Sequence, residues 1–154
     1  YILSKPGKLT DLEYEIIKKH TTIGGRILKD IDIMPQLSDV AMSHHERYDG
    51  KGYPHGKKGE EISLFSRIVC IADSVDAMIS ERSYKPSMPL QSALKEVEAQ
   101  SGLQFDPSLV KVTKSIFAKG VPHEAPLDDL NLGTSFLDEI IKVYTSSQKG
   151  TDLL

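Results

Sequence analysis

The 154-residue chain lacks several features that would assign it to a specialised class of protein. It has a single cysteine, Cys70, so an internal disulfide framework is excluded and a reducing compartment, the cytoplasm, is expected. No apolar run reaches the ~18 residues that a membrane-spanning helix requires, so no direct insertion into a membrane is expected. The net charge of −3, with both signs interspersed, provides no basic stripe and argues against binding to DNA.

The remaining composition is typical of one globular domain with a core of useful size. Hydrophobic residues make up 39% and charged residues 27% of the chain. Cys70 lies within the apolar run Ile68–Ala72, which predicts a buried and unreactive thiol. The chain begins at Tyr1 rather than at methionine, and we therefore expect it to be a piece of a longer protein.

Glycine and proline divide the chain into segments with helical patterns, and no alternating strand of useful length is present. The predicted fold class is therefore all-α, a helical bundle. The predicted helices cover residues 11–20, 22–28, 35–45, 63–79, 89–101, 107–120 and 133–145, and a glycine-rich loop covers 49–59. The first helix begins at a capping box, Thr10–Glu13. The segment 63–79 is apolar on nearly all sides, which predicts a position in the middle of the bundle.

Asp73 stands in the middle of this apolar segment, with Asp76 three residues further on the same face. A carboxylate is rarely buried without a partner, so we expect a cation to face Asp73. A metal or a catalytic role explains such a residue. An ordinary ion pair, or a side chain that reaches solvent, is the alternative.

Histidines provide a second group of candidate ligands. His44 and His45 end a predicted helix and are followed by a polar tail, residues 46–50, while His20 ends the first predicted helix. Three histidines with one aspartate form a normal ligand set for a transition metal. Their spacing alone is only indicative, because hydrogen-bonded or surface histidines are more common. His55 and His123 lie in loops and are interpreted as surface residues.

The loop after the paired histidines contains Tyr53 and Pro54 among four glycines, Gly50, Gly52, Gly56 and Gly59. Such a loop can bring a phenol close to a ligand, although a plain hydrophilic loop explains the glycines equally well. Arg82 and Lys85 follow the Asp73 segment and suit a phosphate, although a solvated face is the usual explanation for such charges.

Three stretches combine these features in one order: LSKPGKLTDLEYEIIKKHTTIGGRIL, HHERYDGKGYPHGKKGEEISLFSRIVCIADSVDAMISERSYK and SGLQFDPSLV, together roughly residues 3 to 112. This string resembles the HD-GYP family of bacterial metal-dependent phosphodiesterases. The resemblance implies an HD-type all-α bundle with two or three divalent metal ions, iron or manganese above all. It also implies hydrolysis of cyclic dinucleotides, chiefly cyclic di-GMP, to a linear dinucleotide or GMP in second-messenger signalling.

The resemblance also implies a role for each matching residue. The metal ligands would be His20, His44, His45 and Asp73. Asp73 and Tyr53 would be the catalytic residues, and the substrate would contact Tyr53, Arg82 and Lys85. Asp76 would support the ligands without binding a metal itself.

One departure concerns the His-Asp pair for which the family is named. In the family this pair, a nearby lysine and an earlier histidine ligand precede the stretch that matches Lys5–Leu9. We therefore expect residues 1–120 to be an HD-GYP domain without its N-terminal helices and 121–154 to be a linker with an extra helix. The full-length protein is expected to carry the His-Asp pair, and the fragment alone is expected to be impaired.

The resemblance leaves several alternatives open. The domain could instead be a catalytically inactive sensor of cyclic dinucleotides or a scaffold for protein interactions. A general HD-type nucleotide phosphohydrolase is disfavoured, because the Gly-Tyr-Pro segment is not part of that broader pattern. Candidate partners are an upstream sensory or receiver domain, a diguanylate cyclase and a second copy of the chain. Cyclic di-GMP and cyclic GMP-AMP are not distinguished, and neither are iron and manganese.

Overall fold

The computed structural model describes residues 2, 5, 7–31, 34–80 and 87–118. The helices are α1 (Asp11–Leu28), α2 (Gln36–Ser43), α3 (Leu64–Ile79), α4 (Leu90–Ala99) and α5 (Pro107–Ala118), with a short 3₁₀ helix, η2 (Gly59–Glu61). No strand occurs in this described part of the chain, and the all-α prediction is confirmed. Arg82, Lys85, His123 and the predicted helix 133–145 lie outside the described residues. None of the described helices combines the length and apolar character needed to cross a membrane.

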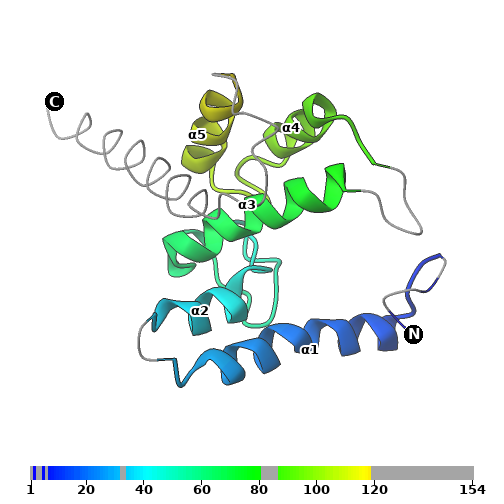
Figure 1. The fold of residues 1–154 in the computed structure, drawn as a ribbon, viewed down its shortest axis with the longest axis vertical. Helices are drawn as coiled ribbons and strands as arrows, with labels where there is room; N and C mark the ends of the chain where they lie inside the picture. Colours follow the sequence, from blue (N-terminus) through cyan, green and yellow to red (C-terminus); the bar gives the residue numbers. More distant parts are fainter. Residues whose placement is uncertain (1, 3–4, 6, 32–33, 81–86, 119–154) are drawn as a thin grey trace, which may run out of the picture. The chain divides into compact units, whose positions relative to one another are not determined.

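The chain forms two compact units, residues 1–106 and 107–154. The first unit holds α1 to α4, and the described part of the second is α5. Within the first unit α1 packs against α2, α2 packs against α3, and α3 packs against α4 (Figure 1). The candidate site therefore belongs to a stack of helices that brings α1 and α3 to the two sides of α2.

Helix α1 is one continuous helix, so the predicted break between residues 20 and 22 is wrong. The hydroxyl group of Thr21 donates a hydrogen bond to the carbonyl oxygen of Lys18, which satisfies this side chain within the helix. Further along, Gly25 is buried, and a Cβ atom there would lie 2.6 Å from Cε of Met42. This glycine lets α1 approach α2 closely, and Ser38 of α2 donates a hydrogen bond to its carbonyl oxygen at 2.8 Å.

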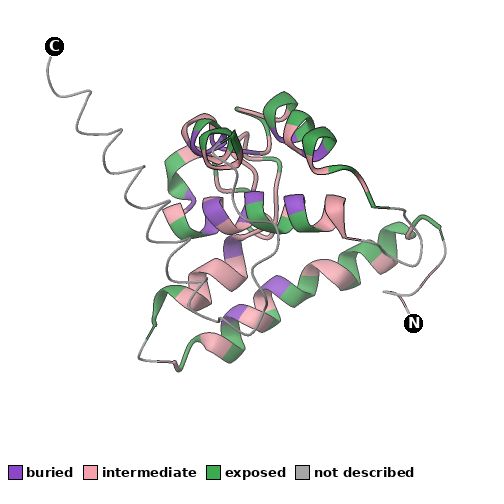
Figure 2. Ribbon diagram, turned by 45° about the horizontal axis from the view of Figure 1, so that its top comes forward, coloured by how far each residue is buried: buried purple, intermediate pink, exposed green. Residues whose placement is uncertain are grey.

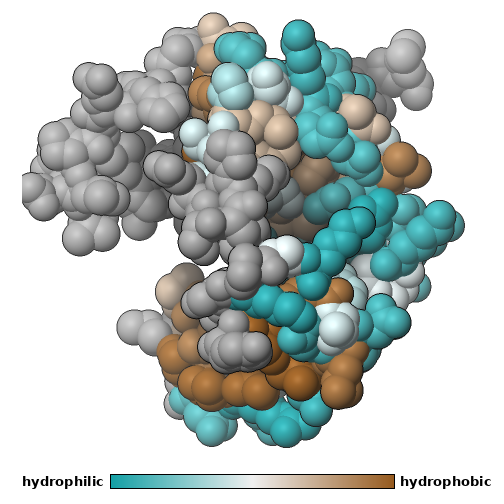
Figure 3. Space-filling view, turned by 90° about the vertical axis from the view of Figure 1, so that its right-hand side faces the viewer, coloured by the Kyte–Doolittle hydropathy of each residue, from teal (hydrophilic) through white to brown (hydrophobic). Residues whose placement is uncertain are grey.

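One face of α1 is apolar and exposed. Its large apolar side chains with high exposure are Leu12 (73%), Ile16 (45%), Ile23 (51%) and Ile27 (70%). The intervals of four and seven residues place them along one side of the helix. Figure 3 shows apolar side chains gathered low in the view, at the level where Figure 1 places α1. The helix is thus amphipathic, and its apolar stripe is only partly covered by described residues.

Helix α3 is buried on one face only (Figure 2). Its buried apolar residues are Ile68, Cys70, Ile71 and Val75. Burial raises the pKa of the Cys70 thiol to about 11, in line with the expected unreactive cysteine. Asp73 and Asp76 are exposed, so the expectation of an apolar surface on nearly all sides is wrong, and Asp73 reaches solvent, which was one of the alternatives left open. The helix instead presents these two carboxylates on a polar face.

A cluster of hydrogen bonds joins α2 to the start of α3. The carboxylate of Asp39 accepts hydrogen bonds from Ser63 at 2.5 Å and from Ser66 at 3.2 Å, and it pairs with Lys57 at 3.2 Å. Ser63 is also the N-cap of α3, where its hydroxyl group accepts from the backbone N–H of Ser66. One aspartate therefore fixes the helix that leads to the paired histidines relative to the helix that carries Asp73.

Candidate functional site

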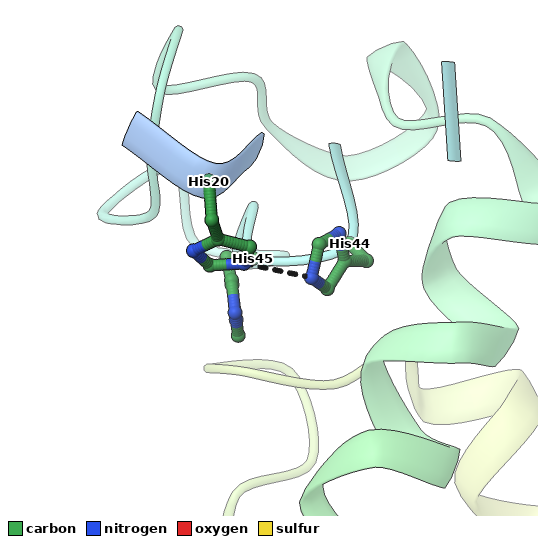
Figure 4. Close-up of side chains that lie close together, drawn as sticks. All are labelled: His20, His44 and His45. Carbon is green, nitrogen blue, oxygen red and sulfur yellow. Dashed lines mark hydrogen bonds between the residues drawn. The ribbon is translucent and has the colours of Figure 1, made fainter. Parts of the chain in front are cut away.

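Three histidines from two parts of the chain meet beside α2 (Figure 4). His20 comes from α1, His44 caps the C-terminus of α2, and His45 follows directly. One ring nitrogen of each histidine lies within 4.8 Å of one from each of the others. The ring centroids of His44 and His45 are 4.2 Å apart, and that of His20 lies 5.3 and 5.0 Å from them. The end of α2 thus brings His44 and His45 to the same place as His20, which precedes His44 by 24 residues.

Backbone carbonyl groups determine which ring nitrogens of His20 and His44 carry protons. Nδ1 of His20 lies 2.6 Å from the carbonyl oxygen of Ile17, and Nδ1 of His44 lies 2.9 Å from that of Ala41. A carbonyl oxygen can only accept, so each Nδ1 is the donor. In a neutral imidazole Nε2 then keeps its lone pair. This second hydrogen bond is the usual way in which a protein orients a metal-binding histidine.

The two Nε2 atoms of His20 and His44 face each other at 3.3 Å. If both rings are neutral with their protons on Nδ1, neither Nε2 can donate to the other, so this contact requires either a second proton on one ring or a cation between the two lone pairs. Two imidazole nitrogens that bind one tetrahedral metal at ~2.1 Å are separated by roughly 3.4 Å. The residues therefore fit a transition metal of the kind that prefers imidazole ligands.

His45 completes the cluster from a half-buried position. Burial, followed by the proximity of His44 and His20, lowers the pKa of His45 to about 4, although the nearby charge of Asp73 acts in the opposite direction. A lowered pKa keeps the imidazole neutral, and the neutral form is the one that binds metals. The environment of His45 thus favours the same chemistry as the geometry of the other two histidines.

Tyr53 lies against this cluster at the tip of the glycine-rich loop. Its ring centroid is 4.9 Å from that of His45, with the planes tilted by 32°, and its backbone N–H donates to the carbonyl oxygen of His45 at 3.2 Å. The peptide bond between Tyr53 and Pro54 is cis. Burial, with Tyr14 and Asp73 nearby, raises the pKa of Tyr53 to about 12. The phenol therefore stays protonated near neutral pH and can donate a hydrogen bond.

Two residues of α1 extend the aromatic contacts of Tyr53. The ring of Tyr14 meets that of Tyr53 edge to face at a centroid distance of 6.2 Å. The ammonium group of Lys18 lies 4.7 Å from the Tyr14 centroid and 5.6 Å from that of Tyr53, within the range of cation–π attraction. Lys18 also pairs with Glu15 at 2.6 Å. Tyr53 is therefore held between the histidine cluster and α1.

A cavity of about 250 Å³ opens beside Tyr53 and His45. It is lined by Tyr14, His45, Arg47, Lys51, Gly52, Tyr53, Cys70 and Gln104. Arg47 is held by Asp49 through two hydrogen bonds at 3.1 and 2.9 Å. Lys51, in contrast, is exposed. The cavity thus offers aromatic surface, phenol groups and an ammonium group directly next to the candidate metal ligands.

The carboxylates of α3 lie apart from the histidine cluster. Asp73 is close enough to influence the pKa values of His45 and Tyr53, but it is not within the 4.8 Å group of ligand atoms found among the described residues. Asp76 accepts a hydrogen bond from Ser80 at 3.1 Å within its own helix. The structure therefore brings three of the four predicted ligands together, with Asp73 nearby.

Glu46, Tyr14 and Lys18 were not among the predicted site residues. Glu46 was interpreted as the start of a polar tail, yet it is 1% exposed. No periodicity marks it, because it stands in a short charged segment between two structural elements. Tyr14 and Lys18 are four residues apart on α1, and this spacing is the one signal that places them on a common face.

Comparisons with known proteins match the same part of the chain. Residues 1–109 match the HD domain family. A cyclic di-GMP phosphodiesterase from Thermotoga maritima is 49% identical over 112 residues, which are 71% of this chain and 30% of that protein. The cyclic di-GMP phosphodiesterase PA4108 from Pseudomonas aeruginosa is 40% identical over 156 residues, covering 96% of this chain and 37% of the relative. The crystal structure of a cyclic GMP-AMP-specific phosphodiesterase from Vibrio cholerae superposes with a TM-score of 0.60 at 31% identity, over 73% of this chain and 26% of that one.

Proposed function

The chain belongs to the HD domain family, in its HD-GYP group, and from this premise we propose that it forms the metal-binding part of a phosphodiesterase that hydrolyses cyclic dinucleotides, with cyclic di-GMP as the first substrate to test. The observation that carries the proposal is the pair of facing Nε2 atoms of His20 and His44, with His45 beside them. Each Nδ1 of this pair is bound to a backbone carbonyl group, so in the neutral rings the two Nε2 lone pairs are directed at one point.

The HD domain family depends on divalent metals, and the histidines of this chain fit them. His20, His44 and His45 would hold one ion, and Asp73 would provide a carboxylate from α3 to the same ion or to a second one. Two or three ions, iron or manganese, are proposed from the family resemblance. When bound, such ions polarise phosphoryl oxygens and lower the pKa of a coordinated water.

The residues beside the histidines would bind and orient the substrate. The protonated phenol of Tyr53 would donate a hydrogen bond to an oxygen of the phosphodiester. The aromatic faces of Tyr14 and Tyr53 at the cavity would accept a nucleobase by stacking, and the ammonium group of Lys51 suits the acceptor edge of guanine. Arg82 and Lys85 remain proposed phosphate contacts.

The test measures turnover of cyclic di-GMP by the intact protein in the presence of Mn²⁺ or Fe²⁺. His44→Ala is expected to reduce turnover by at least ~100-fold, because loss of a ligand should exceed the 10–100-fold cost of losing a residue that only orients one. His55→Ala is the matched control, since its exposed imidazole lies outside the cluster and the substitution keeps the backbone N–H of residue 55, and it is expected to retain activity. Equal activity of the wild-type protein and His44→Ala would contradict the proposal, as would the absence of hydrolysis by the wild-type protein with either metal.

A further inference from the structure

A buried carboxylate lies directly after the paired histidines and has no role in the chemistry described so far. The side chain of Glu46 has no exposed area. Its Oε1 accepts a hydrogen bond from the backbone N–H of His55 at 2.7 Å, and its Oε2 has no hydrogen-bond partner among the described residues. A buried polar side chain is unfavourable for the fold unless it forms hydrogen bonds, so the bond from His55 is the interaction that keeps Glu46 at this position.

Two hydrogen bonds attach the residues on either side of the Tyr53–Pro54 peptide bond to His45 and Glu46. The first runs from the backbone N–H of Tyr53 to the carbonyl oxygen of His45 at 3.2 Å. The second, from His55 to Glu46, holds the opposite side of the Tyr53–Pro54 pair. The two bonds therefore flank the residue whose ring lies against His45.

Close packing supports the same attachment. At Gly52 a Cβ atom would lie 2.5 Å from Cα of Glu46 and 2.6 Å from the carbonyl oxygen of His45, closer than any ordinary contact. On its other side, the carbonyl oxygen of Glu46 accepts from the thiol of Cys70 at 3.8 Å, which connects it to α3. The segment around Glu46 is thus fixed on two sides, by α3 and by the loop.

We propose that Glu46 is a positioning residue that holds the loop through the backbone of His55 and so keeps the phenol of Tyr53 beside the metal-binding histidines. The part of this inference that concerns catalysis depends on the proposed function, whereas the attachment of the loop does not. The required property of Glu46 is its acceptor oxygen at this length of side chain. Its recorded ion-pair partner among the described residues is the exposed imidazole of His55, whose Nδ1 lies 3.9 Å from Oε1. Lys57 pairs with Asp39 and Arg47 with Asp49 instead.

Two substitutions of similar length separate the acceptor from the charge. Glu46→Gln removes the charge and keeps an acceptor oxygen for His55, whereas Glu46→Met keeps the length and removes the acceptor. In the intact protein, Glu46→Gln is expected to retain kcat/KM for cyclic di-GMP within threefold. Glu46→Met is expected to lower it at least tenfold, with an unchanged metal content and faster hydrogen exchange of the His55 amide.

A double-mutant cycle with Tyr53→Phe tests whether Glu46 acts through the phenol. If it does, Glu46→Met lowers kcat/KM by less than twofold in the Tyr53→Phe background. The inference is overturned if Glu46→Met has the same effect in both backgrounds, if it removes the metal, or if Glu46→Gln loses as much activity as Glu46→Met. If Glu46→Met does not fold, retained activity of Glu46→Gln together with slow exchange of the His55 amide in the wild-type protein supports the inference, and failure of either overturns it.

Hydrogen exchange also separates this inference from the proposed function, because it needs no substrate. If the His55 amide exchanges faster in Glu46→Met but the protein hydrolyses no cyclic dinucleotide, the inferred role of Glu46 in attaching the loop is retained and the proposed function is rejected. Unchanged exchange in an active enzyme would reject the role of Glu46 alone.

Discussion

The two sides of the candidate metal site differ in how firmly the described residues hold their ligands. On the histidine side, backbone carbonyl groups orient His20 and His44, and the ring of Tyr53 packs on His45. On the α3 side, Asp73 is exposed and has no hydrogen-bond or ion-pair partner among the described residues. The comparison shows that neighbouring groups orient the imidazoles, whereas none of the described residues holds the carboxylate of Asp73 in one orientation.

The largest effect is expected from removing a ligand on the histidine side. His20→Ala deletes one of the two facing Nε2 atoms, so the affinity of the intact protein for Mn²⁺ should fall by at least ~100-fold, more than for loss of an orienting partner. Isothermal titration measures this affinity without substrate. His55→Ala is again the control. An unchanged affinity of His20→Ala for Mn²⁺ would show that His20 is not a metal ligand and would contradict the difference between the two sides.

A smaller effect is expected on the α3 side. Asp73→Asn should reduce turnover of cyclic di-GMP by ~10–100-fold, because it weakens one ligand but leaves the imidazoles in place. Asp76→Asn is the matched control three residues further along α3, and its own hydrogen bond to Ser80 is compatible with an amide. If both variants lose the same activity, the proposal that Asp73 but not Asp76 is a metal ligand is wrong.

The rigidity of the histidine side can be tested through Gly52. Gly52→Ala places a methyl group against Glu46 and His45, and overpacking of this kind costs about 1–3 kcal/mol of unfolding free energy. Gly24→Ala is the comparison, because Gly24 lies in α1 and its Cβ would meet Cβ of Ala41 in α2 at an ordinary 3.5 Å. Chemical denaturation of the two variants gives the difference, and equal stabilities would mean that the loop is not tightly packed on the histidine segment.

The smallest effect is expected at the start of α1, far from either set of ligands. Thr10→Ala removes the N-cap of α1 and should cost about 1 kcal/mol, with little change in metal affinity. Glu13 completes this capping box, and the side chain of Lys5 and the backbone of Thr10 lower the pKa of its carboxyl group to about 2. Its contribution is therefore present above pH 4.5 and lost as the pH falls towards 2. Thr22→Ala, inside the same helix, is the control in thermal unfolding, and an equal loss of stability there would reject the capping role.

Local signals predicted the helices well where a cap was present. The capping box at Thr10 and the segment after Ser63 were predicted and observed. The predicted break after His20 failed because threonine hydroxyl groups can bond back to helix carbonyls, and because Gly25 serves a close approach to α2. Both effects depend on the three-dimensional neighbourhood of the helix, which sequence patterns do not contain.

The candidate site was predictable from the family resemblance, whereas the reasons for its geometry were not. Residue spacing alone could not bring His20 to the end of α2, since that depends on how α1 packs. The burial of Glu46 was hidden by its charged neighbours, and the exposure of Asp73 by its apolar ones. In each case tertiary packing overrode the local pattern.

The central claim is that His20, His44 and His45 bind one divalent metal through ring nitrogens. An anomalous difference map from crystals of the intact protein loaded with Mn²⁺ tests it most directly. The account predicts a peak at ~2.0–2.3 Å from Nε2 of His20 and His44 and from a ring nitrogen of His45, in the usual range of metal–ligand distances. A fully loaded crystal without a peak between these three imidazoles would contradict it.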